Sequence, residues 1–200
     1  MEPEKFHNIL TELINPQIFG SHDRRELCKE RLGYSTKYRS LTISLLDGDE
    51  VKAVAIRKAG DVKWLTYGAK TFTPYRIKDE FVFFYSGMAE IILMEALNLS
   101  FIGLQSDSVL HHLPEELKEL CRDKVVVILQ DNDKSFKSMV PKIRKFFEHS
   151  DTIIIDFENL LDRKLPHGYD FRDFCNEIVE PKDILELLEN EIMRGGTNDI

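Results

Sequence analysis

From Phe81 onward, strand-like apolar runs alternate with helical segments, and this rhythm constrains the fold of the 200-residue chain more than any other feature. The apolar runs are "FVFFY", "SFIGL", "VVVILQ" and "TIIID", and helical patterns over 88–97, 115–122 and 134–149 lie between or after them. Strands that are apolar at nearly every position are buried on both faces, which is typical of parallel sheets built from right-handed βαβ units. The sequence therefore predicts an α/β domain with a Rossmann-like parallel sheet flanked by helices.

The first 78 residues follow a different pattern. Apolar residues at helical spacing from Lys5, and a second segment, "SHDRRELCKERLGY", that closes on Gly33, predict helices. Three strand patterns then follow, "LTISLL", "VKAVAIRK" and "DVKWLTYG", separated by Asp-Gly and Ala-Gly turns. We expect a small α+β N-terminal lobe over 1–78, with helices and an antiparallel sheet, followed by the α/β domain over 79–180.

The last segment, 181–200, predicts one more helix and a tail. Pro181 suits a first helical turn, and an apolar stripe follows at helical spacing, formed by Ile184, Leu185, Leu188 and Ile192. We expect this helix to pack on its own domain, with a partner surface as the alternative.

Composition narrows the classes of protein. The chain is 42% apolar and 31% charged, no run reaches the ~18 apolar residues that a membrane span requires, and the N-terminus has no signal-peptide pattern. We therefore expect a cytoplasmic protein without a membrane partner. Cys28, Cys121 and Cys175 lie far apart with no CxxC pair, so neither a zinc ribbon nor a disulfide framework is expected.

The net charge of -8 is unevenly placed. Residues 151–200 hold 13 acidic and 5 basic residues, whereas the first 150 residues balance at 22 of each. Overall acidity argues against a non-specific binder of duplex nucleic acid, because phosphate contacts need clustered Lys and Arg. Local basic clusters remain candidates.

The stretch "VVVILQDND" ends an apolar strand on two aspartates. In an extended chain Asp131 and Asp133 share one side, so their carboxylates repel each other unless a positive charge lies between them. A hard divalent cation, Mg²⁺ or Mn²⁺, removes that conflict with few protein ligands. The alternative is a simple turn, since Asp and Asn are common turn formers after strands.

Further acidic residues follow in an order that resembles a known family. The strand "FVFFY" ends in Ser86 and Gly87, and the next helix carries Glu90; downstream, "GYDFRDF" supplies Asp170 and Asp173, one helical turn apart. A strand–Gly–helix unit, a strand with D-x-D and a later G-x-D-x-x-D resemble the Toprim domain of topoisomerases and primases. Within that family, the resemblance is greatest to primases of the phage primase–helicase type.

The resemblance spans roughly residues 41–178 and implies a set of site residues. It identifies Asp131 and Asp133 as metal ligands together with Glu90, and Asp170 with Asp173 as a secondary acidic site. The implied metal is Mg²⁺ or Mn²⁺. The implied partners are nucleic acid or nucleotides, and a helicase or another replication protein.

One departure from the family pattern leaves two functions open. Ser86 stands where the family has a glutamate that is assigned to general acid/base work, and a serine does not accept a proton in that role. The first function is metal-dependent nucleotidyl transfer in DNA replication, in which Glu90 substitutes in part as the catalytic group. The second is a catalytically degenerate module that serves as a binding or assembly part of a replication apparatus. A Toprim nuclease is a third, less favoured alternative.

A basic segment directly follows the D-x-D pair. Residues 134–145 contain no acidic residue and include five basic ones: Lys134, Lys137, Lys142, Arg144 and Lys145. With Arg57 of the small lobe, these residues are candidates for binding phosphate or nucleic acid. The alternative is a solvated helix face and an exposed strand residue.

Overall fold

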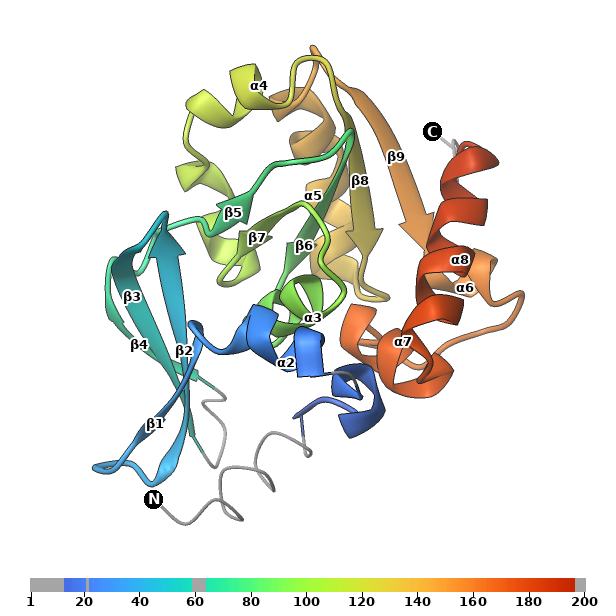
Figure 1. The fold of residues 1–200 in the computed structure, drawn as a ribbon. Helices are drawn as coiled ribbons and strands as arrows, with labels where there is room; N and C mark the ends of the chain where they lie inside the picture. Colours follow the sequence, from blue (N-terminus) through green and yellow to red (C-terminus); the bar gives the residue numbers. More distant parts are fainter. Residues whose placement is uncertain (1–12, 21, 59–63, 197–200) are drawn as a thin grey trace.

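The computed structural model describes residues 13–20, 22–58 and 64–196, which form two sheets (Figure 1). The smaller sheet is antiparallel with the order β1-β2-β3-β4, and its strands are β1 (Leu32–Ser35), β2 (Ser40–Asp47), β3 (Glu50–Arg57) and β4 (Trp64–Gly68). The larger sheet has the order β5-β7-β6-β8-β9, and its strands are β5 (Tyr75–Arg76), β6 (Phe81–Ser86), β7 (Phe101–Leu104), β8 (Val125–Gln130) and β9 (Asp151–Asp156). Strands β6 to β9 run parallel and β5 is antiparallel to β7. The predicted α/β fold with a parallel-strand sheet is confirmed.

Helices cover both faces of the larger sheet because alternate residues of each strand point to opposite sides. On β6, Val82 and Phe84 belong to one apolar core, whereas Phe83 and Tyr85 belong to the other. The described helices are α2 (His22–Cys28), α3 (Glu90–Ala96), α4 (Glu116–Leu120), α5 (Lys134–Phe146), α6 (Phe157–Leu160), α7 (Phe171–Ile178) and α8 (Pro181–Met193), with 3₁₀ turns η1 (Pro16–Phe19) and η2 (Asp107–His112). Apolar residues of α4 and α5 fill the first core, and those of α3, α7 and α8 fill the second.

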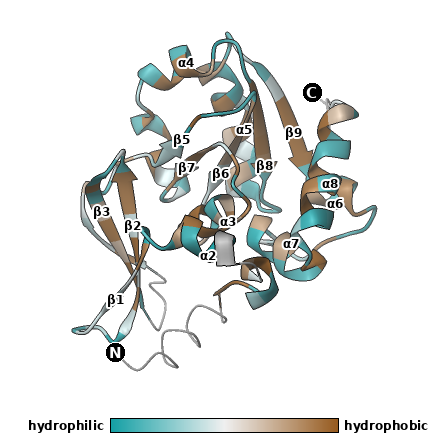
Figure 2. Cartoon of the chain, viewed as in Figure 1, coloured by the Kyte–Doolittle hydropathy of each residue, from teal (hydrophilic) through white to brown (hydrophobic). Residues whose placement is uncertain are grey.

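The hydropathy of the elements follows this arrangement. Figure 2 shows β9 as a largely hydrophobic strand, whereas α8 alternates between hydrophobic and hydrophilic residues along its length. On α8, Ile184, Leu188 and Ile192 are buried, and Pro181 occupies the first turn. The final helix therefore packs on its own domain, as expected. Within the described part of the chain, none of the helices has the length and apolar character needed to cross a membrane.

The N-terminal lobe contains the predicted antiparallel sheet, with Gly48 at positive φ in the β2–β3 turn. The predicted helix from Lys5 lies outside the described residues as far as residue 12. The prediction that the second helical segment reaches Gly33 is wrong, because α2 ends at Cys28 and β1 begins at Leu32. Gly33 pairs with Thr42 of β2, so a long-range strand contact overrides the local helical pattern.

The two sheets share one apolar core. Leu41, Ile43 and Leu45 alternate along β2 and join the same core cluster as Ile92 of α3 and Phe101 of β7. The short strand β5 already pairs with β7, so the larger sheet includes residues before the proposed domain boundary at residue 78. That boundary stays a prediction.

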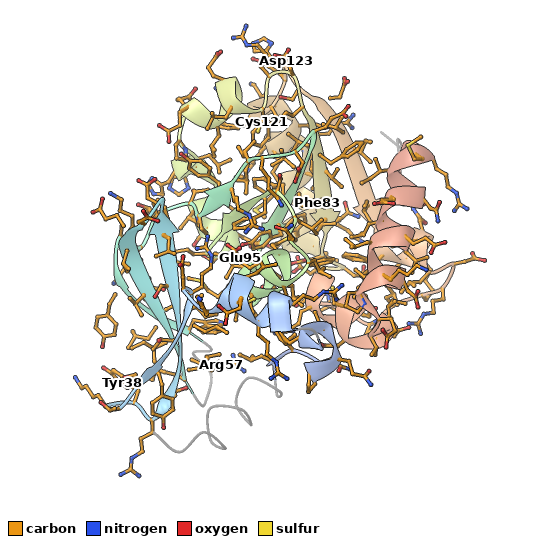
Figure 3. The ribbon with its side chains drawn as sticks, in the orientation of Figure 1. Tyr38, Arg57, Phe83, Glu95, Cys121 and Asp123 are labelled. Atoms are coloured by element: carbon orange, nitrogen blue, oxygen red, sulfur yellow. The ribbon has the colours of Figure 1, made fainter. Side chains whose placement is uncertain are left out.

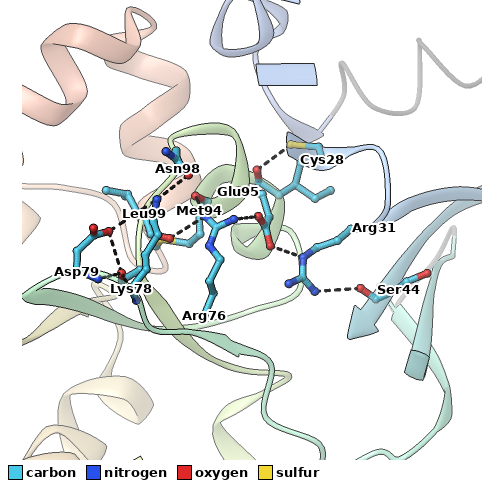
Figure 4. A network of polar contacts seen from close by, with 12 residues as sticks. Cys28, Arg31, Ser44, Arg76, Lys78, Asp79, Met94, Glu95, Asn98 and Leu99 are labelled. Atoms are coloured by element: carbon cyan, nitrogen blue, oxygen red, sulfur yellow. Dashed lines mark hydrogen bonds and ion pairs between the residues drawn. The ribbon is translucent and has the colours of Figure 1, made fainter. Parts of the chain in front are cut away.

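A buried ionic network also joins the two lobes (Figure 4). Glu95 on α3 is 3% exposed, and its carboxylate forms ion pairs with Arg31, which precedes β1, and with Arg76 on β5. Arg76 also donates to the carbonyl of Leu99 at 2.9 Å, and the carbonyl of Arg31 accepts from the amide of Ser44 on β2 at 2.7 Å. A buried carboxylate with two arginine partners is neutralised, and its removal would leave buried positive charge.

Candidate functional site

Strands β6 and β8 are neighbours in the larger sheet and run in the same direction, so they end at the same edge. Parallel α/β sheets place their sites at this carboxyl edge. After β6, Gly87 has φ +130°, and a Cβ at this position would clash with the carboxylate of Glu90. Glycine is therefore required both by the backbone and by the acid that follows it.

Glu90 begins α3 with its side chain facing inward, and it is 4% exposed. Burial, followed by the negative charge of Asp170, raises the pKa of its carboxyl to about 7, and the guanidinium of Arg172 opposes both effects. Near neutral pH this carboxyl therefore exists in comparable amounts with and without its proton.

Asp131 follows β8 directly and lies close enough to Glu90 for their charges to interact. Burial, first of all, and the negative charges of Glu90, Asp170, Asp133 and Asp107 together raise the pKa of Asp131 to about 9. The structure thus brings carboxylates from four separate segments into one electrostatic cluster. We call this set the strand-end acids: Glu90, Asp107, Asp131, Asp133, Asp170 and Asp173.

Within this cluster, Asp133 also has a structural role as a helix cap. Its Oδ1 accepts a hydrogen bond from the amide of Phe136 at 2.7 Å and caps the N-terminus of α5. Its own amide donates to the carbonyl of Asp131 at 2.8 Å. The segment "DND" is therefore the turn that leads into α5, with Asp133 as its cap, and the role of the two aspartates as metal ligands stays a prediction.

Asp170 and Asp173 form a capping box at the start of α7. The side chain of Asp170 accepts from the amide of Asp173 at 2.9 Å, and Asp173 accepts in return from the amide of Asp170 at 3.3 Å. Nη2 of Arg172 donates to Oδ2 of Asp170 at 3.0 Å. Burial lowers the pKa of Arg172, but Asp170, Glu90, Asp173 and Asp131 outweigh that effect and raise it. Arg172 is thus a cation of the chain itself within the acidic cluster.

Asn132 holds the α7 acids against the end of β8. Its amide donates to the carbonyl of Tyr169 at 2.7 Å, and its carbonyl accepts from the amide of Gly168 at 2.8 Å. Its side chain donates to the carbonyls of Leu165 and Pro166 at 3.0 and 3.1 Å. The loop before α7 is therefore fastened to the D-x-D turn through the residue between the two aspartates.

Sequence reasoning missed Asp107 and Arg172. Asp107 begins η2 after β7, where its Oδ1 accepts from the hydroxyl of Ser86 at 2.8 Å and its Oδ2 accepts from that of Ser135 at 2.7 Å. The signal for Asp107 was its place three residues after a buried strand. The signal for Arg172 was its position as the one basic residue in "GYDFRDF".

The basic residues predicted beside the acids fall into two groups. Lys134 and Lys137 lie in the first turn of α5, where Nζ of Lys137 donates to Oδ1 of Asn132 at 2.8 Å. They are next to the strand-end acids. Their role in binding phosphate stays a prediction.

The second group lies further along α5. Lys142, Arg144 and Lys145 follow Lys134 by about 12 to 17 Å along the helix axis, at 1.5 Å per residue. Nε of Arg144 donates to Oγ1 of Thr152 on β9 at 3.2 Å, near the opposite edge of the sheet. The structure does not bring these three residues to the strand-end acids.

Arg57 ends β3 in the small sheet. Its guanidinium carbon lies 5.6 Å from the ring centroid of Trp64, with which it is paired across β3 and β4 (Figure 3 labels Arg57). By strand alternation Arg57 shares the side of Ala53 and Ala55, which face the common core. Its proposed place in a binding cleft stays a prediction.

A metal site is supported by the chemistry of these groups more than by their present geometry. Clustered carboxylates are the ligands that Mg²⁺ and Mn²⁺ prefer, and after burial the neighbouring carboxylates contribute to the raised pKa of Asp131. Over residues 13–20, 22–58 and 64–196, however, no three acidic, histidine or cysteine side chains form a group ready to hold a metal ion. A cation would have to draw these side chains together.

The fold itself has known counterparts. No protein-family model and no curated protein match the chain. Among solved structures, it is similar to the primase fragment of the bacteriophage T7 primase–helicase, with TM-score 0.58 and 13% identity, over 82% of this chain and 70% of that one. It is also similar to the Aquifex aeolicus primase (zinc-binding and RNA polymerase domains), with TM-score 0.57 and 14% identity, over 92% and 55% of the two chains.

A third similar structure is a T7 assembly in which the lagging-strand DNA polymerase interacts with primase domains of two gp4 subunits bound to an RNA/DNA hybrid and dTTP. Its TM-score is 0.55 at 13% identity, over 82% of this chain and 86% of that one. The chain spans about half the length of the Aquifex protein that it matches. At this level of identity the likeness shows the fold, and the chain has a primase-like fold.

Proposed function

We propose that this protein acts in DNA replication as a primase-like module whose strand-end acids bind a divalent cation, and through it the phosphates of nucleic acid or nucleotides. The order of elements and acids resembles that of a Toprim domain: Glu90 after the first parallel strand, Asp131 and Asp133 after β8, and Asp170 at the start of α7. The primase-like fold supports this assignment independently of the sequence motifs.

The observation that carries the proposal is the convergence of carboxylates from four separate segments near the ends of the parallel strands. Burial and four neighbouring carboxylates raise the pKa of Asp131 to about 9, so its ionised form is disfavoured, and a bound divalent cation would stabilise that form. Asp131, Asp133 and Glu90 are the residues that would hold the ion. When bound, Mg²⁺ or Mn²⁺ supplies charge neutralisation and orientation for phosphate oxygens. Lys134 and Lys137 lie next to these acids and would contact the same phosphates.

A second candidate function is a catalytically degenerate module that binds or assembles within a replication apparatus. Two observations favour it. The hydroxyl of Ser86, where a Toprim domain has its glutamate, is engaged with Asp107, and Arg172 already supplies one positive charge to the acids. In this function the fold and a weak cation site remain, and a helicase or another replication protein is the partner.

Calorimetric titration with Mn²⁺ and Mg²⁺ at pH 8 tests the cation site. We expect wild type to bind with measurable heat, and Asp131→Asn/Asp133→Asn to lose that heat because two ligands are gone. The matched control is Asp123→Asn/Asp151→Asn, which removes two exposed carboxylates from the other edge of the same sheet. No heat from wild type at millimolar metal, or equal heat from both double variants, would contradict the site.

Primer synthesis on single-stranded DNA separates the two functions. If the protein is an active nucleotidyltransferase, metal-dependent extension products form with wild type and are lost in Asp131→Asn. If the module is degenerate, wild type gives no product while still binding Mn²⁺. Ser86→Glu then tests whether the serine is the cause, since a glutamate at this position gains activity only if the rest of the site is competent.

A further inference from the structure

The small sheet has one face in the common core and one face turned away from it. Ala53 and Ala55 of β3 are buried in the core, so by alternation Val54 points to the other side. Val54 pairs with Tyr67 of β4 and with Ser44 of β2, and directly paired residues share a face. We call this second side the outer face; it carries Thr42, Ser44, Val54, Ile56, Leu65 and Tyr67.

Two tyrosines meet on this outer face. Tyr67 is 47% exposed, and its ring centroid lies 6.3 Å from that of Tyr38, which comes from the β1–β2 turn. The two hydroxyl groups are in hydrogen-bond contact. Figure 3 shows Tyr38 at the periphery of the molecule, at the end of the small sheet. The contact joins residues 29 positions apart and fixes two aromatic rings at an accessible surface.

The tyrosine pair is surrounded by basic residues. Nζ of Lys37 lies 5.2 Å from the ring centroid of Tyr38, Arg39 follows in the same exposed turn, and the positive charge of Lys58 also acts on Tyr38. Residues 32–70 contain seven basic and four acidic residues, in a chain whose net charge is -8. Three of these four acids, Asp47, Asp49 and Glu50, lie at the β2–β3 turn, at the other end of the sheet.

We propose that the outer face binds single-stranded nucleic acid, with bases stacked on Tyr38 and Tyr67 and with the backbone phosphates contacted by Lys37, Arg39 and Lys58. Accessible aromatic rings interleaved with cations are the pattern by which proteins hold single strands without reading their sequence. An antiparallel sheet presents such rings on a rigid surface. A duplex would not bind to the two rings in this way, because its bases are already stacked on one another.

This surface is separate from the strand-end acids and does not rest on the proposed cation site. The tyrosines and lysines belong to the β1–β2 turn, the end of β3 and β4, whereas the acids follow β6, β7 and β8 and begin α7. Binding at the outer face should therefore persist without metal. A binding measurement in the presence of a chelator therefore tests the outer face separately from the cation site.

Fluorescence anisotropy in EDTA with a labelled 20-nucleotide oligothymidylate, a 20-base-pair duplex and an abasic oligomer of equal length provides the test. We expect wild type to bind oligothymidylate more tightly than either of the other probes. Tyr38→Ala/Tyr67→Ala should weaken oligothymidylate binding about tenfold or more and leave the abasic oligomer nearly unaffected, because only the stacking is removed. Tyr67→Phe, which keeps the ring, should retain most of the affinity.

The lysines give a second, independent readout. Lys37→Gln/Lys58→Gln should weaken both single-stranded probes and reduce the slope of log affinity against log salt by about 0.7 for each lost phosphate contact. Lys182→Gln, an exposed lysine at the start of α8, is the matched control and should change neither. Circular dichroism confirms that each variant is folded.

Two results would overturn the proposal. One is unchanged oligothymidylate affinity in the folded Tyr38→Ala/Tyr67→Ala variant, which would assign the outer face to another partner such as a protein. The other is equal loss for the abasic and base-bearing oligomers, which would leave no role for stacking. Neither result bears on the calorimetric test of the strand-end acids, so failure of one proposal is distinguishable from failure of the other.

Discussion

Helix α3 carries two buried glutamates whose surroundings are opposite. Glu95 is 3% exposed and lies between Arg31 and Arg76, which join it to the small lobe and to β5. Glu90, five residues earlier and 4% exposed, lies near Asp131 and Asp170. Glu95 is balanced by two cations, whereas burial and the neighbouring carboxylates raise the pKa of Glu90 to about 7.

This difference separates a carboxylate with a structural role, Glu95, from one that we propose to be functional, Glu90. A buried carboxylate with two arginine partners links the elements that supply them, and removing one partner leaves an uncompensated charge that destabilises the fold. A buried carboxylate among other carboxylates costs folding free energy, and such perturbed groups concentrate at functional sites. The same seven-residue helix thus joins the two lobes at its end and contributes to the strand-end acids at its start.

The largest expected effect comes from Glu95→Ala. Because this change leaves the buried Arg31 and the half-buried Arg76 without their counter-charge, we expect it to lower the free energy of unfolding by about 3–5 kcal/mol. Urea denaturation followed by circular dichroism measures the loss. Glu186→Ala on α8 is the control and should change stability by less than about 0.5 kcal/mol. If Glu95→Ala lowers the free energy of unfolding no more than Glu186→Ala does, the structural role of Glu95 is contradicted.

An effect of the opposite sign is expected from Asp131→Asn. The pKa of Asp131 is about 9 in the folded chain and near 4 in an unfolded one, so the folded state holds a proton that the unfolded state releases. The contribution of this proton to the stability of wild type is therefore fully present below about pH 4 and is lost progressively as pH rises toward 9. An asparagine does not titrate, so the variant escapes this loss.

We expect Asp131→Asn to exceed wild type in stability by about 1–3 kcal/mol at pH 8, with the difference shrinking toward pH 4. Thermal denaturation at intervals between pH 4 and pH 9 measures the trend. Asp123→Asn, an exposed residue at the opposite edge of the sheet, should show no such pH-dependent difference. A constant difference across the range would mean that Asp131 carries no elevated pKa.

Much of the fold was predictable because its strongest pattern is local. The runs that became β6, β8 and β9 are apolar at successive positions, which follows directly from burial on both faces of a parallel sheet. Strand β1 was not predictable, because Gly33 and its neighbours form a strand only through pairing with β2. The strand order of the larger sheet, in which β6 lies between β7 and β8, was likewise not predictable, because it depends on tertiary contacts and not on a local sequence pattern.

The site was predictable in part for the same reason. Asp131 directly follows a strand whose end is visible in the sequence, so its place at the carboxyl edge could be inferred. Asp107 lies in a 3₁₀ turn three residues after a four-residue strand, and its contacts are with Ser86 and Ser135, which belong to two other segments. Arg144 shows the converse error, since the pattern of charges did not reveal that a 13-residue helix carries its last turn away from the acids.

The smallest expected effect comes from Asn132→Ala, and it tests how the acids near Glu90 are held together. The Asn132 side chain donates to the carbonyls of Leu165 and Pro166, so the change releases the loop before α7 and should cost about 1 kcal/mol in stability. As Asp170 moves away, the pKa of Glu90 should fall, since the charge of Asp170 is its main electrostatic perturbation after burial. NMR titration of the Glu90 carboxyl measures the shift, and Asn190→Ala on α8 is the control. If the pKa of Glu90 is unchanged in Asn132→Ala while stability falls, burial alone raises that pKa. Glu90 would then differ from Glu95 because it has no pair of arginine partners, and not because of its acidic neighbours.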